Sequence, residues 1–302
     1  MKKAFTLVEL LVVIGIIAVL MAILVASLSG STDSANATKC LANMRSLAIG
    51  CQAVALSTEH YPSAGSHQQL GEVTFSAGSA QQQASQHRGW IAWNTVTASG
   101  AYISPYANDR DAREMCLTNG TLWTAVNQNR SAYVCPMHRK AADKKLKGAL
   151  PEGPAWSYVM NAYFDWDAKG RPYWNDHRGR WAKDFKRADR ILLFAELPFL
   201  AISGVQNPTF SQGPALDNDP VLQYDGNGGS GKEIIGFNHR LGKRETYAHV
   251  CFADGHTAKF LLPKNPSQSN LRDLTKWLCN PKDSSGKYFD VTFANDTYQK
   301  VQ

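Results

Sequence analysis

The sequence predicts an α+β fold in which one long N-terminal helix carries a head built on a mainly antiparallel β-sheet. Three observations lead to this fold class. An apolar run opens the chain, an amphipathic helical pattern follows it to about residue 60, and short strand-like runs separated by loops fill most of the remainder. The 302 residues are enough for one substantial hydrophobic core together with a separate helical element.

The first element is a helix that is long enough to cross a membrane. Leu10–Ala26 contains no charged residue, and a helix that starts at Phe5 spans a hydrocarbon core of about 30 Å in about 22 residues. Lys2 and Lys3 favour a cytoplasmic location for the N-terminus, which places the bulk of the chain outside. We therefore expect residues 5–28 to form a transmembrane segment.

Glu9 is out of place in such a segment, because a carboxylate at mid-bilayer costs about 3 kcal/mol. A secretory signal peptide would explain the basic start, but this apolar core is long and only weak cleavage sites follow it. A plain membrane anchor would explain the length and leave Glu9 without a partner. A third interpretation is needed to explain how the charge of Glu9 is compensated.

The stretch from Ala4 to Glu9, AFTLVE, resembles the prepilin cleavage and methylation signal of type IV pilins and type II secretion pseudopilins. The resemblance implies that a prepilin peptidase removes residues 1–4, cuts between Ala4 and Phe5, and methylates the new N-terminus. The Phe5 ammonium group of one subunit would then neutralise Glu9 of its neighbour in an apolar filament core, since a buried charge is tolerated only when it is paired. Ala4 stands where the family usually has glycine.

The amphipathic continuation is expected over residues 29–60. Residues 29–33 (SGSTD) are either a polar interruption of the helix or the start of a new one. The apolar positions that follow at helical spacing are Leu41, Met44, Leu47, Ala48, Cys51 and Ala55. This stripe needs a sheet to cover it, and we expect that sheet in the head.

The head is expected over residues 61–302. Residues 62–88 are rich in Ser, Gln, Ala and Gly and indicate a surface loop. Strand-like runs follow as WIAWNTV, SAYVCPM, WSYVMNAYF, ILLFAEL, EIIGF and HVCFADGHTAKFLL. In the last run, Asp254-Gly255 is the preferred pair for a two-residue type I′ hairpin turn. Residues 265–281 indicate a short helix that Ser267 or Ser269 caps.

A second resemblance covers most of the chain. The motifs CLANMRSL from Cys40, YP at 61–62, YVCP at 133–136, SYVMN at 157–161, AE at 195–196 and FADGH at 252–256 occur in order. This series is similar to the pseudopilin-like family named for a histidine, nine residues and then Asp-Gly. Here fourteen residues separate His239 from Asp254, which indicates an insertion of about five residues between Leu241 and His249.

Charge and cysteine content limit the classes of function. The net charge of +7 is low for a dedicated nucleic-acid binder. Residues 171–190 mix basic and aromatic side chains, a composition that suits nucleic acid, yet three aspartates interrupt it and we favour a solvated face. In an exported head up to three disulfides would be allowed, with the pairing open, among Cys40, Cys51, Cys116, Cys135, Cys251 and Cys279.

Two groups of side chains are compatible with metal binding. Asp225, Asn227 and Glu233 lie in a glycine-rich stretch that loosely resembles a calcium loop, although its spacing is not that of an EF-hand. The second group is expected at or near strand ends and consists of Glu196, His239, Asp254 and His256. These residue types are also compatible with a small metal site. The simpler interpretation of this second group is structural, with Asp254 required by its turn and Glu196 paired to an arginine. No phosphate loop, nucleophile elbow or metalloprotease motif occurs, and we expect no enzymatic activity.

The sequence therefore predicts a structural subunit of a type II secretion pseudopilus or a type IV pilus-like filament. Its expected partners are like subunits, the prepilin peptidase, the inner-membrane assembly machinery and the cytoplasmic membrane. Before assembly it would be a single-pass inner-membrane protein with an extracytoplasmic head, and afterwards part of a periplasmic or surface filament. The alternative is a monomeric, membrane-tethered protein whose aromatic and basic head binds glycan or nucleic acid.

Overall fold

The computed structural model describes residues 6–64, 89–92, 114, 116–146, 154–165, 178–184, 187–200, 202, 205, 221–222, 234–241, 245–279 and 300–301. The side chains of residues 24–31 and of a few residues at element ends are not among those described.

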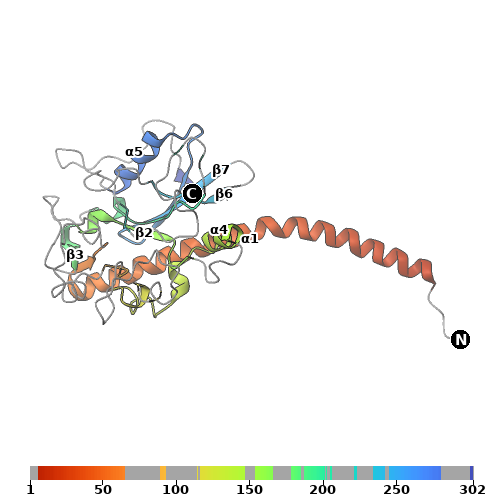
Figure 1. The fold of residues 1–302 in the computed structure, drawn as a ribbon, viewed down its shortest axis with the longest axis horizontal. Coiled ribbons are helices and arrows are strands. Elements are labelled where there is room, and N and C mark those ends of the chain that lie inside the picture. Colours follow the sequence, from red (N-terminus) through yellow and green to blue (C-terminus); the bar gives the residue numbers. More distant parts are fainter. Residues whose placement is uncertain are drawn as a thin grey trace.

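One helix, α1, runs without a break from Leu7 to Thr58 over 52 residues. At about 1.5 Å per residue it is roughly 78 Å long. Its first half projects away from the head and its second half lies against the head (Figure 1). The helix also continues through residues 29–33, so this polar stretch is neither an interruption nor a new start. The helix ends at Glu59, which adopts a left-handed conformation with φ of 64°.

The remaining elements are short, and they follow α1 in chain order. The strands are β1 (His60–Pro62), β2 (Tyr158–Asn161), β3 (Arg178–Trp181), β4 (Leu192–Glu196), β5 (Val221–Leu222), β6 (His239–Leu241), β7 (Glu245–Phe252), β8 (Thr257–Leu261) and β9 (Lys300–Val301). The helices are α4 (Pro136–Leu146) and α5 (Gln268–Cys279), with 3-10 turns at Arg130–Tyr133, Ala162–Asp165, Ala182–Asp184 and Ala188–Arg190.

The main sheet has the strand order β5-β2-β4-β7-β8-β9, and β1 and β3 form a separate antiparallel pair. Every pairing in the main sheet is antiparallel except that of β2 with β5. Strand β8 occupies one edge of β7, and β4 and β6 share the other edge end to end. The sheet is therefore mainly antiparallel, as the sequence predicts.

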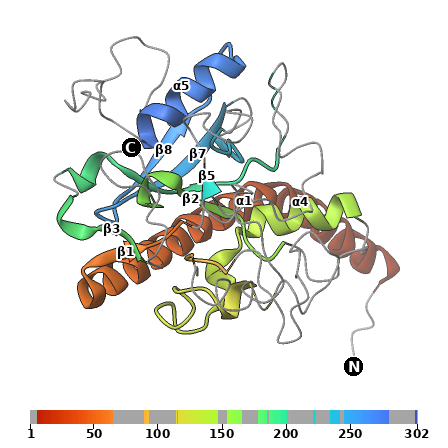
Figure 2. The ribbon, with the colours of Figure 1, turned by 60° about the vertical axis from the view of Figure 1, so that its left-hand side comes forward.

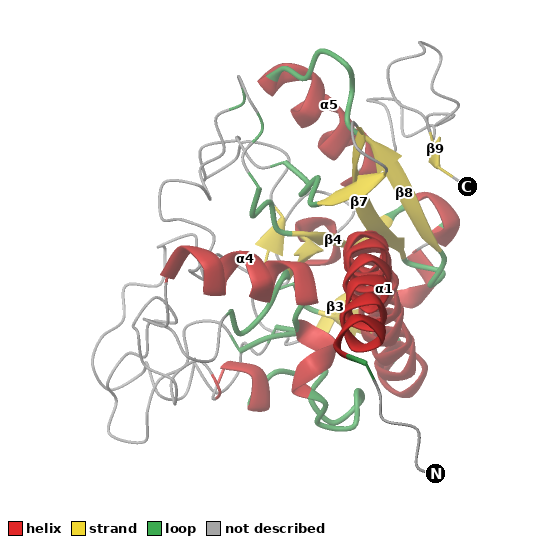
Figure 3. Cartoon of the chain, turned by 90° about the vertical axis from the view of Figure 1, so that its right-hand side faces the viewer, coloured by secondary structure: helices red, strands yellow, loops and turns green. Residues whose placement is uncertain are grey.

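The head half of α1 packs on one side of this sheet, and α5 lies on the other side (Figures 2 and 3). The expected apolar stripe of α1 faces the core: Met44, Leu47, Ala48 and Cys51 are fully buried. Leu41 is the exception among the predicted positions, since it is only half-buried. On the far side, Leu271, Leu274 and Leu278 of α5 are buried, and Ser267 caps this helix through the Asn270 amide at 3.2 Å.

The hairpin between β7 and β8 differs from the predicted two-residue type I′ turn. The Gly255 amide donates to the Phe252 carbonyl at 2.9 Å, and the Phe252 amide donates to the His256 carbonyl at 2.9 Å. Gly255 has φ of +86°, whereas Asp254 has negative φ, and a type I′ turn requires positive φ at both central residues. The loop is thus a three-residue turn with Gly255 at its left-handed position.

Three predicted strands are absent where the structure describes them. Residues 90–92 are loop with a bend at Trp90 and Ile91, residues 131–137 include a 3-10 turn and the start of α4, and residues 234–237 belong to no strand. Trp90, Ile91, Tyr133 and Ile235 are nevertheless fully buried. These segments are apolar because they are buried in the core. A short apolar run does not by itself distinguish a strand from another buried segment.

Candidate functional site

The N-terminus of α1 is closed by a reciprocal pair of hydrogen bonds between Thr6 and Glu9. The Thr6 hydroxyl accepts from the Glu9 amide at 3.3 Å, and Oε2 of Glu9 accepts from the Thr6 amide and from the Thr6 hydroxyl, both at 2.8 Å. This capping box satisfies orphan donors at the helix start, and the helix dipole favours a negative charge there. Glu9 therefore has a partner within its own chain. Ala4 and Phe5 lie outside the described residues.

The projecting half of α1 presents an apolar surface on all sides. Every large aliphatic side chain from Leu7 to Ile23 is at least 46% exposed in the isolated chain. A helix that is apolar all round normally lies in a core, against other helices or in lipid. Among the described residues, no helical stretch combines the length and the hydropathy that crossing a membrane requires.

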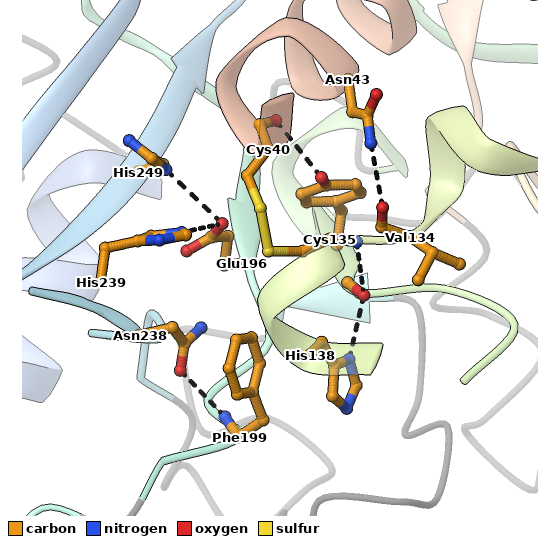
Figure 4. The surroundings of a disulfide bond; sticks show 12 residues. Cys40, Asn43, Val134, Cys135, His138, Glu196, Phe199, Asn238, His239 and His249 are labelled. Carbon is orange, nitrogen blue, oxygen red and sulfur yellow. Dashed lines mark hydrogen bonds and ion pairs between the residues drawn. A yellow bond between two sulfur atoms is a disulfide. The ribbon is translucent and has the colours of Figure 1, made fainter. Parts of the chain in front are cut away.

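A second candidate site lies in the head, where a carboxylate and two imidazoles are buried together (Figure 4). Nε2 of His239 lies 2.7 Å from Oε1 of Glu196, and Nδ1 of His249 lies 3.6 Å from the same oxygen. All three side chains are at most 1% exposed. We call these three residues the histidine–carboxylate cluster.

Strand register explains why this cluster forms. The pairing of Ala195 with Val250 places Glu196 opposite His249 on neighbouring strands. Strand β6 lies against the first half of β7, beyond the end of β4, and its residue His239 pairs with Tyr247. His249 and Tyr247 are two residues apart and so face the same side of β7. The end of β4 thereby meets β6 and β7, two consecutive strands that lie more than 40 residues later in the sequence.

The electrostatics of the cluster favour a charged carboxylate. Burial by itself raises the pKa of Glu196, but the nearby charges of His239 and His249 and the hydrogen bond with His239 outweigh burial and hold this pKa at about 2. Burial also lowers the pKa of His249, against the opposing influence of Glu196. His239 is therefore the nearest hydrogen-bonding partner of a carboxylate that stays ionised.

A disulfide between Cys40 of α1 and Cys135 lies beside the cluster (Figure 4). Its surroundings are fixed by polar contacts: Asn43 donates to the carbonyls of Ser131 and Val134, and the Cys135 amide donates to the Ser157 hydroxyl at 2.9 Å. The sulfurs of Cys40 and Cys135, a carboxylate oxygen of Glu196 and a ring nitrogen of His239 all lie within 4.8 Å of one another. The four residues are buried.

The predicted metal group of Glu196, His239, Asp254 and His256 is divided in the structure. Glu196 pairs with histidines instead of the expected arginine, while Asp254 and His256 contact each other at 2.6 Å in the β7–β8 loop. That loop begins after Phe252, three residues beyond His249 of the cluster, which is a separation of about 10 Å along the strand. The predicted calcium residues Asp225, Asn227 and Glu233 lie outside the described residues.

Sequence reasoning grouped Glu196 with His239 and missed His249 and the disulfide. The alternation in β7 does place Tyr247, His249 and Cys251 on one face, so a strand pattern could have suggested His249. The pairing of Cys40 with Cys135 spans 95 residues and depends on where α1 docks, which no local pattern gives. The other four cysteines (Cys51, Cys116, Cys251 and Cys279) are buried and free of disulfides.

Comparison with known proteins gives one match, which covers residues 1–25. This stretch matches the family model described as the prokaryotic N-terminal methylation motif. No similar curated protein and no similar solved structure was found. The chain thus carries a pilin-type prepilin signal, which points to a structural, pilin- or pseudopilin-like substrate of a prepilin peptidase.

Proposed function

We propose that this protein is a structural subunit of a type II secretion pseudopilus or a type IV pilus-like filament. The observation that carries the proposal is the projecting half of α1, whose aliphatic side chains from Leu7 to Ile23 have no cover within the head. Full burial of one such side chain is worth about 1.5–3 kcal/mol, so packing of these helices against one another would strongly favour assembly. The methylation motif at the same end of the chain supports this assignment.

Processing and assembly would be linked through the capping box. Cleavage between Ala4 and Phe5 leaves Phe5 with a free ammonium group directly before Thr6. In the isolated chain the Glu9 carboxylate binds Thr6. In the apolar interior of a filament it would pair instead with the Phe5 ammonium of a neighbour, because an unpaired charge is costly there. Before assembly the same helix would hold the subunit in the cytoplasmic membrane, with the inner-membrane machinery as its partner.

The first experiment is the intact and N-terminal mass of the protein isolated from cells. A chain that begins at N-methyl-Phe5 supports the proposal. A chain that begins near residues 27–30 would show cleavage by a signal peptidase and would refute it. The substitution Ala4→Gly restores the residue usual in the family, and we expect the processed fraction to rise or stay complete.

The second experiment separates assembly from processing. In Glu9→Gln the charge is lost at constant shape, and we expect filaments in sheared surface or periplasmic fractions to disappear while Phe5 remains the N-terminus. Glu245→Gln removes an exposed carboxylate at the start of β7 and should leave filaments unchanged. A stable monomer that binds glycan or nucleic acid and never copurifies with filament machinery would contradict the proposal.

A further inference from the structure

Besides the projecting helix, the head contains a buried set of metal-ligand side chains that the filament proposal does not use. We propose that the reduced chain binds a thiophilic divalent cation between Cys40, Cys135, Glu196 and His239, and that the cation and the disulfide are alternative states of this site. The inference rests on the arrangement of these four residues and is independent of the filament proposal.

The donor set fits a tetrahedral site of the zinc class. Zinc binds thiolate sulfur at about 2.3 Å and imidazole nitrogen or carboxylate oxygen at about 2.0–2.2 Å, so its ligand atoms lie roughly 3.3–3.8 Å apart. The four ligand atoms here already lie within 4.8 Å of one another. Two thiolates and an imidazole also select against calcium and magnesium, which prefer oxygen ligands.

Unsatisfied polar atoms at the site supply a second observation. Oε2 of Glu196, Nδ1 of His239 and both ring nitrogens of His249 are buried and have no hydrogen-bond partner among the described residues. Each such atom costs about 1–3 kcal/mol when it stays unsatisfied. A simple buried ion pair accounts for Oε1 of Glu196 and Nε2 of His239 and leaves the other atoms unexplained.

A cation would give Glu196 and His239 the further partner that the ion pair alone does not supply. It would take one oxygen of Glu196 and one nitrogen of His239, while His249, whose Nδ1 lies 3.6 Å from Glu196, would orient the carboxylate from outside the ligand shell. Two thiolates and one carboxylate carry three negative charges, and a divalent cation would reduce the net charge of the buried site to about −1.

An external dithiol can convert the disulfide state into the metal-binding state. The dithiol gives two electrons and two protons to the Cys40–Cys135 bond, the S–S bond breaks, and the reductant leaves as its cyclic disulfide. Binding of the cation then releases the two thiol protons to water. In the reverse direction a disulfide-bearing oxidant reforms the S–S bond and the cation is expelled, because the sulfurs of a disulfide are far poorer ligands than thiolates.

The test uses the full chain in detergent micelles. The protein is reduced with a phosphine, freed of the reductant, and refolded from urea with Zn²⁺, or with Co²⁺ as a spectroscopic probe. We expect one Zn²⁺ per chain, and for Co²⁺ a sulfur-to-cobalt charge-transfer band. Reoxidation should release the bound Zn²⁺ in a 1:1 ratio with the disulfide formed. The oxidised chain should bind at least 100-fold more weakly.

Variants identify the ligands. The double substitution Cys40→Ser/Cys135→Ser should abolish the charge-transfer band, and His239→Gln should weaken Zn²⁺ binding by at least 10-fold. The matched control is Cys51→Ala/Cys251→Ala, which removes two other buried cysteines and should keep both band and affinity. A band that survives in the first double variant and is lost in the control would overturn the proposal.

Loss of folding on reduction would not prevent the test. If the reduced chain without metal is unfolded, Zn²⁺ should restore the near-ultraviolet circular dichroism of the oxidised chain, since binding to the folded state stabilises it. Failure of Zn²⁺ to restore the fold, or a reduced and folded chain that binds no Zn²⁺, would refute the inference.

Discussion

The disulfide between Cys40 and Cys135 is expected to be a main source of stability in the head. It closes a loop with a sequence separation of 95 residues. For a loop of this size, loss of entropy in the unfolded chain corresponds to about 4.7 kcal/mol at 25 °C, and measured effects are typically about 2–4 kcal/mol. We therefore expect Cys40→Ala/Cys135→Ala to lower the free energy of unfolding of the head by about 2–4 kcal/mol.

The measurement is urea unfolding in the presence of a chelator, followed by fluorescence, to which the fully buried Trp90 contributes. Because the crosslink restricts the unfolded chain, its removal should also increase the m value. Cys51→Ala is the matched control, since Cys51 is buried on the same helix without a disulfide. A double variant within about 1 kcal/mol of this control, at unchanged m value, would refute the loop-closure reasoning.

Three further predictions concern the head. The free energy of unfolding should fall as pH drops from about 6.5 towards 2: the unfolded chain takes up protons first, because the folded pKa of His249 lies below its usual 6.5 and that of Glu196 is about 2 against a usual 4.5. Glu196→Gln should make the free energy of unfolding less dependent on pH below 4.5, as measured by urea titrations. An unchanged pH dependence would contradict the lowered pKa of Glu196 in the folded chain. Gly255→Ala should cost about 1–2 kcal/mol in the same assay because φ is +86°, and a neutral effect would exclude this turn geometry. Met44→Ala should lower the midpoint of thermal unfolding through a loss of about 2–5 kcal/mol, whereas Ile49→Ala, 58% exposed, should change it little; equal effects would argue against this docking of α1.

The sequence predicted the features that depend on local periodicity. The long helix, the buried stripe around Met44 and Leu47, and the helix near the C-terminus follow from the 3.6-residue period. The hairpin was located correctly at Asp254 and Gly255, yet its turn type depends on one φ angle that Asp-Gly pairs do not fix. Local patterns thus predicted the helices and the β7–β8 hairpin, but they also predicted strands in three buried segments that the structure describes as loop, 3-10 turn or helix.

The histidine–carboxylate cluster could not be predicted in the same way. It arises because β4 and β6 share one edge of β7, an arrangement that sets Glu196 beside His239. The sequence grouped Glu196 and His239 with Asp254 and His256, which the structure places apart in the β7–β8 loop. A site built by strand order needs the topology, and topology is a property of the whole chain.

The position of the disulfide has a mechanical consequence. Ala37 is the first buried residue along the described part of α1, and Cys40 follows it by one turn, so the covalent bond lies where the helix leaves the head. A tensile force on the projecting half reaches this bond before it reaches the packed segment that ends at Thr58. The load passes through Cys135 into the head, and the interface between α1 and the sheet is shielded from being peeled apart turn by turn. Reduction of the Cys40–Cys135 disulfide would remove this covalent connection, and the packed interface between α1 and the sheet would then carry the load.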